Sequence, residues 1–478
     1  MKILNYFFQL ILLISLFSCK VNKKTKVVTE KPLPKSYINQ SDTVTKELAK
    51  WKEIIFNPTL SKLIDTALKN NFDLKDALQK IEMSRSGVLL NKGIRLPDVN
   101  ANVNLGRRKF GDYTMDGVGN FDTNLSDNIK SDQVIPNPLP DYYVGFQSTW
   151  EIDLWGKLKN LKESAASKFI ASQYGKDLIV TNLIADIAAL YFELLALDKE
   201  VNVLKENIKL QENAYELMLT QKDVGRANQL AVELMKAQLL NSKTILVEVE
   251  QQMLECEAKL NYLCGQYPNK VPVDTSFYNT QLNLEIKTGV PSALLDNRPD
   301  IKQAEYEVLA NNANLAFAKK AFYPSFNINA FVGLQSFNAL LLLDVPASLA
   351  YNTIGGLAAP LLNRRKLKSD LLLTKAQQKS AYINYEKTVV NAFKEVFVSM
   401  NNLNKTREAF NLKNEEVDVL KKSILSSQEL FKAGRCNYLE VITVQKNALE
   451  SQIDLIGIYK RQGIAIVQLY KSLGGGWK

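Results

Sequence analysis

Residues 225–230 read GRANQL and residues 434–439 read GRCNYL, so one short motif occurs twice at an offset of 209. The two copies stay in register, without a gap, as far as Gly265 and Gly474. Glycine tolerates the positive φ that ends a helix sharply, so each copy predicts a tight turn between two helices. The repetition itself predicts an internally duplicated chain.

The earlier parts of the two halves match at a different offset. DLKDA at residues 73–77 corresponds to DIKQA at residues 300–304, an offset of 227. Because 227 exceeds 209 by 18, the first half holds 18 additional residues between its two matching segments. The most economical place for them is residues 107–142, whose Gly, Asn, Asp and Pro content is typical of a long loop.

Alternating sequence follows the first matching segment of each half. Residues 99–105 are apolar at every odd position and Asn at every even one, and residues 144–154 alternate in the same way. The second half repeats this at residues 326–332 and, less regularly, at 349–359. The pattern predicts two hairpins, or four strands, each with one apolar and one polar face. A membrane barrel and a soluble sheet packed on one side both remain possible from alternation alone.

Two long stretches, residues 157–220 and 364–431, contain no proline. Each predicts a nearly continuous helix of roughly 100 Å. Apolar residues recur in them at spacings of four and three, as at Leu197, Val201, Leu204, Ile208, Val389, Phe393, Val396, Met400 and Leu403. Such narrow, sustained stripes are typical of coiled-coil seams. A helical bundle scaffold would explain these seams but not the alternating strands.

Composition excludes several kinds of active site. The 478 residues include no histidine, which makes His-based catalysis and His-ligated metal sites impossible. The four cysteines form no CxxC motif, and we expect Cys256 and Cys264 to be buried apolar residues or tolerated surface thiols. The net charge of +10 comes from scattered cations, which disfavours a nucleic-acid partner. We predict no catalytic residue and no metal site. A lipoprotein enzyme is therefore the least favoured of the functions considered.

The N-terminus indicates the compartment. A cationic start, a short apolar run and the ending LFSC predict a secretory signal peptide over residues 1–18, too short to span a membrane. The ending resembles a bacterial lipobox, which implies that Cys19 becomes the acylated first residue of the mature chain. An ordinary cleavage site beside a chance cysteine is the alternative. Residues 19–50 are predicted to form a lipid-anchored tether.

Four strands cannot close a barrel alone, and open edges are not tolerated in lipid. Several copies of the chain must therefore share one barrel if the strands enter a membrane. Two copies would give eight strands and a bore filled by side chains, whereas three would give twelve and leave a water-filled lumen. The Asn-rich faces favour three copies.

Several segments resemble signatures of the outer membrane factor family, the TolC-like channels, in its lipoprotein branch. They are WKEIIFNPTLSKLIDTAL at residues 51–68, WEIDLWGK at 150–157, RPDIKQAE at 298–305 and LYKSLGGGW at 469–477. The resemblance covers nearly the whole mature chain. It implies a homotrimer of mixed, mainly α class, with a 12-stranded membrane β-barrel and a long coiled-coil α-helical barrel in the periplasm.

The resemblance also implies how the protein works. It would be a passive outer-membrane export duct in a tripartite efflux system such as those of multidrug resistance. It would be lipid-anchored in the outer membrane, with no cofactor besides the covalent lipid on Cys19. Its partners would be a periplasmic adaptor (membrane fusion protein) and an inner-membrane transporter that supplies the energy, with a proton-driven one expected. The cargo cannot be read from the sequence.

The duplicated plan predicts a layout of consecutive parts. They are a signal peptide (1–18), a tether (19–50), first helices (51–97), a β-hairpin (98–156), long helices (157–265, tip at 223–228), a linker (266–298), a first helix (299–324), a second β-hairpin (325–362), long helices (363–473, tip at 432–437) and a tail (474–478).

Two positions carry over from the family's tip segment, which residues 434–441 match. An acidic side chain that helps to line the closed entrance follows the tip glycine by six residues, which is Glu440 here. The family often has a second acid three residues later, where this chain has Thr443. Three copies of Glu440 around an axis would attract cations. An ordinary solvated helix carboxylate is the alternative.

The tip turns supply the remaining candidates. Gly225 and Gly434 are expected to end the long helices and to contact the adaptor. Arg226 and Arg435, at equivalent positions, are expected to bond neighbouring helices or the adaptor. The rival to a channel is a lipid-anchored periplasmic coiled-coil adaptor or scaffold without a pore.

Overall fold

The computed structural model describes residue 34 and residues 57–274, 291–362 and 364–477. The chain divides into two units, Met1–Pro32 and Leu33–Lys478, and every element given below belongs to the second. The predicted signal peptide, Cys19, most of the tether and part of the linker lie outside the described residues.

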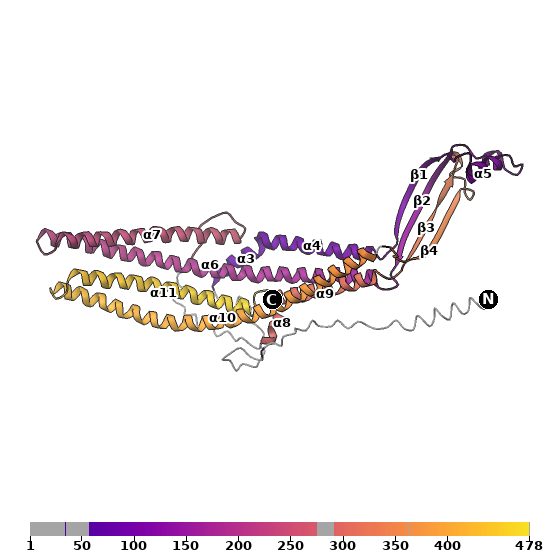
Figure 1. Ribbon diagram of the computed structural model, residues 1–478. Coiled ribbons are helices and arrows are strands. Elements are labelled where there is room, and N and C mark those ends of the chain that lie inside the picture. The colour runs from indigo at the N-terminus through magenta and orange to yellow at the C-terminus, as the bar shows by residue number, and fades with distance from the viewer. Residues whose placement is uncertain (1–33, 35–56, 275–290, 363, 478) are drawn as a thin grey trace. The chain divides into compact units, whose positions relative to one another are not determined.

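Helices and strands occur in two equivalent sets (Figure 1). The first set comprises α3 (Pro58–Asn70), α4 (Phe72–Gly93), β1 (Asp98–Arg108), α5 (Met115–Asn124), η1 (Ser131–Gln133), β2 (Leu139–Ile152), α6 (Lys157–Asp223) and α7 (Gln229–Leu263). The second set comprises η3 (Pro291–Ala293), α8 (Leu294–Asn297), α9 (Pro299–Lys320), β3 (Ser325–Ser336), η4 (Ala339–Leu341), β4 (Leu349–Ala358), α10 (Arg364–Lys432) and α11 (Tyr438–Ser472).

The internal duplication is confirmed in the lengths of the equivalent elements. Helices α4 and α9 have 22 residues each, and α7 and α11 have 35 each. The connection from β1 to β2 covers residues 109–138, whereas that from β3 to β4 covers residues 337–348. These connections contain 30 and 12 residues, so the 18 additional residues lie in the first, which includes α5.

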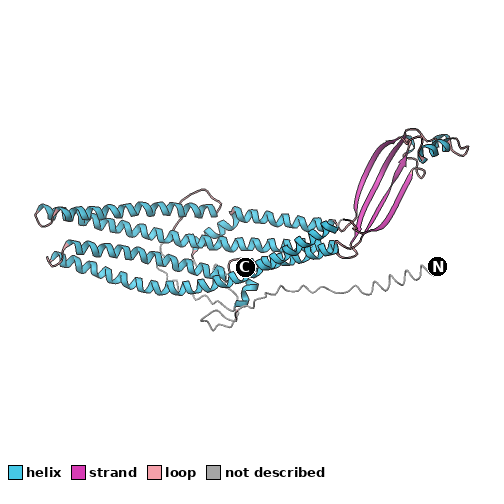
Figure 2. Ribbon diagram, in the orientation of Figure 1, coloured by secondary structure: helices cyan, strands magenta, loops and turns pink. Residues whose placement is uncertain are grey.

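The four strands, magenta in Figure 2, form one antiparallel sheet in the order β1-β2-β3-β4 that the labels of Figure 1 follow. The register places Val103 opposite Val144, and Phe146 opposite Val332, so apolar side chains share one face across the strands. Asn102 lies opposite Gly145 on the other face, where its side-chain amide donates to the side-chain Oε1 of Gln147 at 3.1 Å. β2 begins five residues before the predicted 144, because β1 extends to Arg108 and pairs with it there.

The WEIDLWGK segment makes the transition from β2 into α6. Both carboxylate oxygens of Asp153 accept backbone N–H groups at the start of the helix, from Leu158 at 3.0 Å and Lys159 at 2.7 Å. Gly156 has φ 70°, which a residue with a side chain rarely adopts. The indole of Trp155 donates to the Pro324 carbonyl at 2.7 Å and so links this junction to the start of β3.

Helix α6 is central to the helical part, because it packs against α3, α4, α7, α9 and α11. Helix α6 contains a stretch long and apolar enough to cross a membrane by length and composition alone, but 56% of that stretch is buried within the chain. Its fully buried residues include Tyr191, Leu194 and Leu195. This stretch therefore forms part of the chain's own core.

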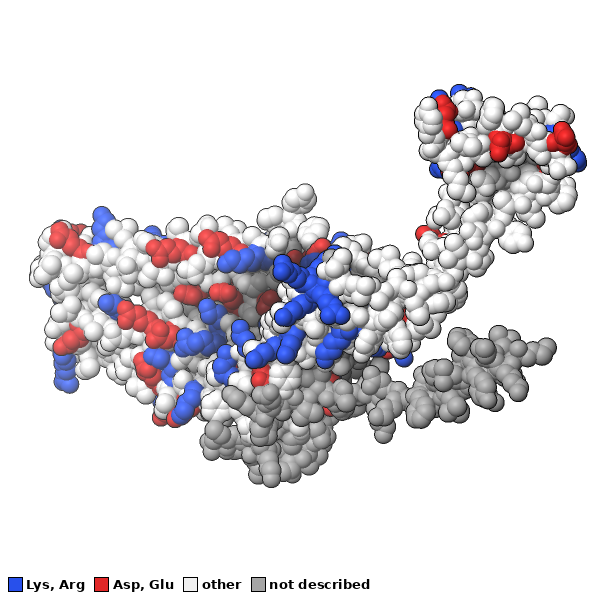
Figure 3. Space-filling view, turned by 45° about the vertical axis from the view of Figure 1, so that its right-hand side comes forward, with Lys and Arg blue, Asp and Glu red and all other residues white. Residues whose placement is uncertain are grey.

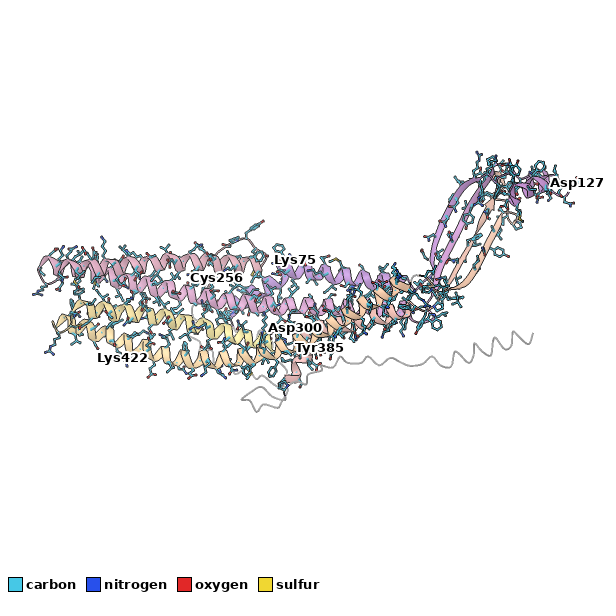
Figure 4. All side chains as sticks on the ribbon, viewed as in Figure 1. Lys75, Asp127, Cys256, Asp300, Tyr385 and Lys422 are labelled. Carbon is cyan, nitrogen blue, oxygen red and sulfur yellow. The ribbon has the colours of Figure 1, made fainter. Side chains whose placement is uncertain are left out.

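Equivalent hydrogen bonds hold the C-terminal ends of α7 and α11. The end of α7 is bonded to the residue before α4, and the end of α11 to the residue before α9. The Asn71 amide donates to the Leu263 carbonyl at 3.0 Å, and the Arg298 guanidinium donates to the Ser472 carbonyl at 2.9 Å. Each donor lies just before α4 or α9, at corresponding positions of the repeat. Arg298, which is buried, also pairs with Asp300 at 2.7 Å; Asp300 is labelled in Figure 4. The RPDI segment is thus a structural anchor.

Candidate functional site at the helical tips

The two hairpin tips share one backbone geometry. At the first, Gly225 has φ 74°, its N–H donates to Lys222 at 2.9 Å, and the Arg226 N–H donates to Gln221 at 2.8 Å. At the second, Gly434 has φ 69° and its N–H donates to Phe431 at 3.0 Å. Two such overlapping bonds close a helix in the Schellman manner. A Cβ at either glycine would meet nothing within 4 Å, so φ alone favours glycine there.

Asparagine caps the returning helix at both tips. The Asn228 side chain accepts from the Ala231 N–H at 2.9 Å, and the Asn437 side chain accepts from the Glu440 N–H at 3.0 Å. At the second tip the Glu440 carboxylate also accepts from the Asn437 N–H at 3.2 Å, which completes a capping box. Glu440 is exposed and holds the start of α11.

Thr443 is exposed as well, and its hydroxyl donates to the Leu439 carbonyl within the same helix at 2.8 Å. Arg226 and Arg435 are exposed, and neither forms an ion pair with another described residue. Each tip also presents an exposed leucine at corresponding positions, Leu230 and Leu439. The predicted tip residues are therefore brought together at solvent-facing turns.

An apolar cluster joins the two hairpins of the chain just behind the tips. Four residues of α6 and α7 are buried in it, namely Met218, Ala231, Val232 and Met235. Partly buried residues of the second hairpin pack against them, namely Phe431, Tyr438 and Ile442. This cluster could not be predicted from the sequence, because it depends on pairing between helices that are far apart in the chain. The capping box, in contrast, has a recognisable sequence pattern, because Asn437 and Glu440 have the N-x-x-E spacing.

Among the described residues, no group of three or more His, Cys, Asp or Glu is placed to hold a metal. Cys256 and Cys264 are both buried and free, so the surface alternative does not apply to them. Burial, followed by the charge of Glu193, raises the pKa of Cys256 to about 12, which leaves it an unreactive thiol.

The polar face of the sheet forms a second candidate surface. The Gln335 amide donates to the Asp141 carboxylate at 2.8 Å across β3 and β2. Gly145 and Gly333 lie opposite each other on this face, and a Cβ on either would come within 3.0 Å of Tyr143. The Tyr143 ring therefore covers the glycine pair, and it meets the Phe331 ring edge-on at 5.9 Å.

The sequence profile of the outer membrane efflux protein family matches residues 63–266 and 290–475, which is most of the chain. The chain belongs to this family. The cation efflux system protein CusC of Escherichia coli O6:H1 (strain CFT073) is 23% identical over 430 residues, 90% of this chain and 89% of CusC. The solvent efflux pump outer membrane protein SrpC of Pseudomonas putida is 28% identical over 459 residues, 93% of this chain and 92% of SrpC.

Solved structures show the same fold. A crystal structure of CusC gives a TM-score of 0.83 at 22% identity, over 96% of this chain and 100% of that one. The open state of the Neisseria gonorrhoeae MtrE outer membrane channel gives 0.82 at 21% identity, over 96% and 98%. The predicted fold class, the outer-membrane location and the role as an efflux channel subunit are confirmed, and the relatives are channels rather than adaptors.

Proposed function

We propose that three copies of this chain close one channel, with twelve strands in the outer membrane and a coiled-coil tunnel of helices in the periplasm. The four-stranded sheet carries this proposal. Within the described chain, β1 and β4 are edge strands, each paired on one side only. An unpaired edge is not tolerated in lipid, and three sheets supply enough strands for a water-filled bore.

The two faces of the sheet support the same arrangement. Val103, Phe146 and Tyr351 lie on the apolar face and are exposed in the single chain. Asn102, Gln147 and Gln335 lie on the opposite face. An apolar face toward lipid and a polar face toward water is the pattern of a membrane barrel.

The hairpin tips form the periplasmic entrance in this proposal. Gly225 and Gly434 set the turns, while Arg226 and Arg435 extend from them toward a periplasmic adaptor. Glu440 and Thr443 line the closed gate, and adaptor docking separates the tips. Exposed Leu230 and Leu439 beside the arginines support a docking surface that is both apolar and cationic.

A proton-driven inner-membrane transporter supplies the energy, and this chain contributes no catalysis and no cofactor. Cys19 carries the lipid that holds the N-terminus at the membrane. The cargo is a small molecule whose class the transporter selects. Relatives named for the export of cations and of solvents support a duct with little selectivity of its own.

The test uses the full-length lipidated chain, purified in detergent and inserted into planar bilayers. We expect native mass spectrometry to show a trimer, and we expect small conductance that rises when the tips are loosened. Addition of the genomically neighbouring adaptor should also raise it. A monomer, or a trimer with no conductance in any variant, would refute the channel.

The residue assignments need a separate comparison. The triple variant Glu440→Gln, Arg226→Gln, Arg435→Gln should raise the conductance of the channel. The control triple variant Lys236→Gln, Lys421→Gln, Lys422→Gln should leave the conductance unchanged. Equal conductance in both triple variants would show that the tip residues do not form the gate.

A further inference from the structure

A band of cations lies where the four strands join the helices. Each junction supplies two, and we call these eight residues the basic rim: Lys92, Arg95, Lys157, Lys159, Lys319, Lys320, Arg364 and Arg365. Asp153 lies within these junctions, and two further carboxylates, Asp98 and Glu151, lie at the adjoining ends of β1 and β2. Both Asp153 oxygens already accept backbone N–H groups. The eight cations outnumber these three carboxylates, so the rim carries a net positive charge.

Most rim cations have no ion-pair partner in the described part of the chain. Lys157 pairs with Glu151 at 2.6 Å, and Lys320 donates to the Gly156 carbonyl at 3.3 Å. The other six form no ion pair with any residue that the structure describes. All six are exposed. Their charge is thus directed outward rather than used to hold the fold.

Helix stability explains only part of the rim. Lys92, Lys319 and Lys320 lie in the last turns of α4 and α9, where a cation favours the helix dipole. Helices α6 and α10 instead begin at the rim, and neither has an acidic residue in its first turn. Cations at a helix start oppose the dipole. Lys159, Arg364 and Arg365 therefore weaken their own helices slightly, and an external anion would offset that cost.

Apolar side chains accompany the cations at every junction. The exposed ones include Leu96, Trp155, Tyr323 and Leu362. The rings of Trp155 and Tyr323 lie 5.7 Å apart. Aromatic residues beside cations are typical of the boundary between lipid and water, because the ring enters the headgroup layer and the charge meets phosphate.

The distribution of charged residues along the strands indicates the same boundary between lipid and water. The charged residues of β1 and β2 lie near the strand ends, and β3 and β4 contain none. In Figure 3 the strands are mostly white, whereas blue and red side chains cover the helices and the loops. The uncharged span of the sheet therefore ends at the basic rim.

We propose that the basic rim binds the anionic phospholipid headgroups of the membrane leaflet on the helical side. The occupant follows from charge complementarity and from continuity with the apolar face of the sheet, which adjoins the acyl chains of the same leaflet. Lys and Arg donate to phosphate oxygens, and the exposed apolar residues enter the headgroup layer. This lipid site goes beyond the transport function.

The experiment measures lipid retention by the purified full-length assembly. Native mass spectrometry in detergent compares phosphatidylglycerol with phosphatidylcholine at equal concentration. We expect preferential retention of phosphatidylglycerol that weakens at high salt. The variant Lys159→Gln, Arg364→Gln, Arg365→Gln should lower this preference at least tenfold, since each cation near an anionic surface contributes about fivefold.

Two controls sharpen the result. Lys236→Gln, Lys421→Gln, Lys422→Gln removes equal charge from exposed helical sites and should leave the preference unchanged; Lys422 is labelled in Figure 4. Arg364→Lys, Arg365→Lys keeps the charge and should retain the preference. An unchanged preference in the rim variant, or equal loss in the control, would overturn the proposal. So would altered ion selectivity in bilayers with unchanged lipid retention, which would place the rim in the lumen.

Conductance and subunit number are measured for every variant. A channel that fails to assemble is thereby distinguished from one that assembles and binds no anionic lipid.

Discussion

The two hairpin tips have the same turn and different supports. At corresponding positions behind the turn, the first hairpin has Met218 and Ala231, both buried, where the second has Ser427 and Glu440. Ser427 is buried but satisfies its hydroxyl within its own helix, by donating to Ile424 at 2.9 Å. Glu440 is exposed in its capping box.

This difference separates what local sequence controls from what packing controls. Glycine and asparagine set both turns, because the bonds they make lie within a few residues. Apolar residues then fix the first hairpin, while the second rests against it through Phe431, Tyr438 and Ile442. We infer that the first tip is the anchored one and that the second is easier to displace.

The largest effect on tip stability should come from replacing Ala231 of the first tip by glutamate, the residue that the second tip has at the corresponding position 440. Ala231→Glu buries a carboxylate in the apolar cluster, where it would have no partner, and should cost several kcal/mol. We expect hydrogen exchange of residues 218–235 to accelerate more than a hundredfold. The opposite change, Glu440→Ala, should cost about 1 kcal/mol or less. Similar exchange in the two variants would contradict the inferred anchoring.

A cavity at the anchored tip should have the next largest effect. Met218→Ala removes buried apolar volume and should destabilise the tip by roughly 2–4 kcal/mol. Its matched control is Ser427→Ala, which loses one hydrogen bond worth about 1 kcal/mol. Protease cleavage rates at the two tips measure both. If the serine variant is cleaved as fast as the methionine variant, the two tips have equal support.

The glycines should behave alike at both tips. Gly225→Ala and Gly434→Ala each force a side chain into the left-handed region, at about 1–2 kcal/mol, with no steric contact to add to it. We expect the two variants to raise the exchange of their own tip amides by similar factors. A large difference would mean that the turns, rather than the packing, distinguish the tips.

The parts predictable from sequence were those whose cause is local or periodic. Alternation gave the strands, proline-free stretches gave α6 and α10, and the repeated glycines gave the turns. Whether Cys256 is buried or exposed could not be predicted from the sequence, because its burial depends on packing against the neighbouring helix α6. The Cys256 thiol donates to the Leu190 carbonyl of that helix.

The candidate site divides in the same way. The position of Glu440 at the tip was predictable from the motif, but its carboxylate is engaged with the backbone rather than free. Whether it also lines a gate stays a prediction, because the gate would form between copies of the chain. The apolar spacing that includes Met218 predicted a coiled-coil seam, but not that this cluster joins the two hairpins.

The two roles of Glu440 can be separated by isosteric substitution. Glutamine still serves in a capping box, whereas alanine does not, so Glu440→Gln should keep the tip stable and remove only the charge. A gate role predicts that cation selectivity in planar bilayers falls in both variants. If selectivity is unchanged in Glu440→Gln while Glu440→Ala alone alters conductance, the carboxylate acts only as a cap.

The smallest expected effect concerns the thiol beside this carboxylate. The hydrogen bond with Glu440, then partial burial and the Glu440 charge, raise the pKa of Cys436 above its usual value. A raised pKa leaves less thiolate, so alkylation near pH 8 should be slow, and Glu440→Gln should lower the pKa and speed it severalfold. Buried Cys256 and Cys264 serve as unreactive internal controls. The rate difference should vanish well above the pKa, where both proteins are thiolates. A difference that persists there would mean altered access to Cys436, and hence that the second tip is held by Glu440 as a structural contact.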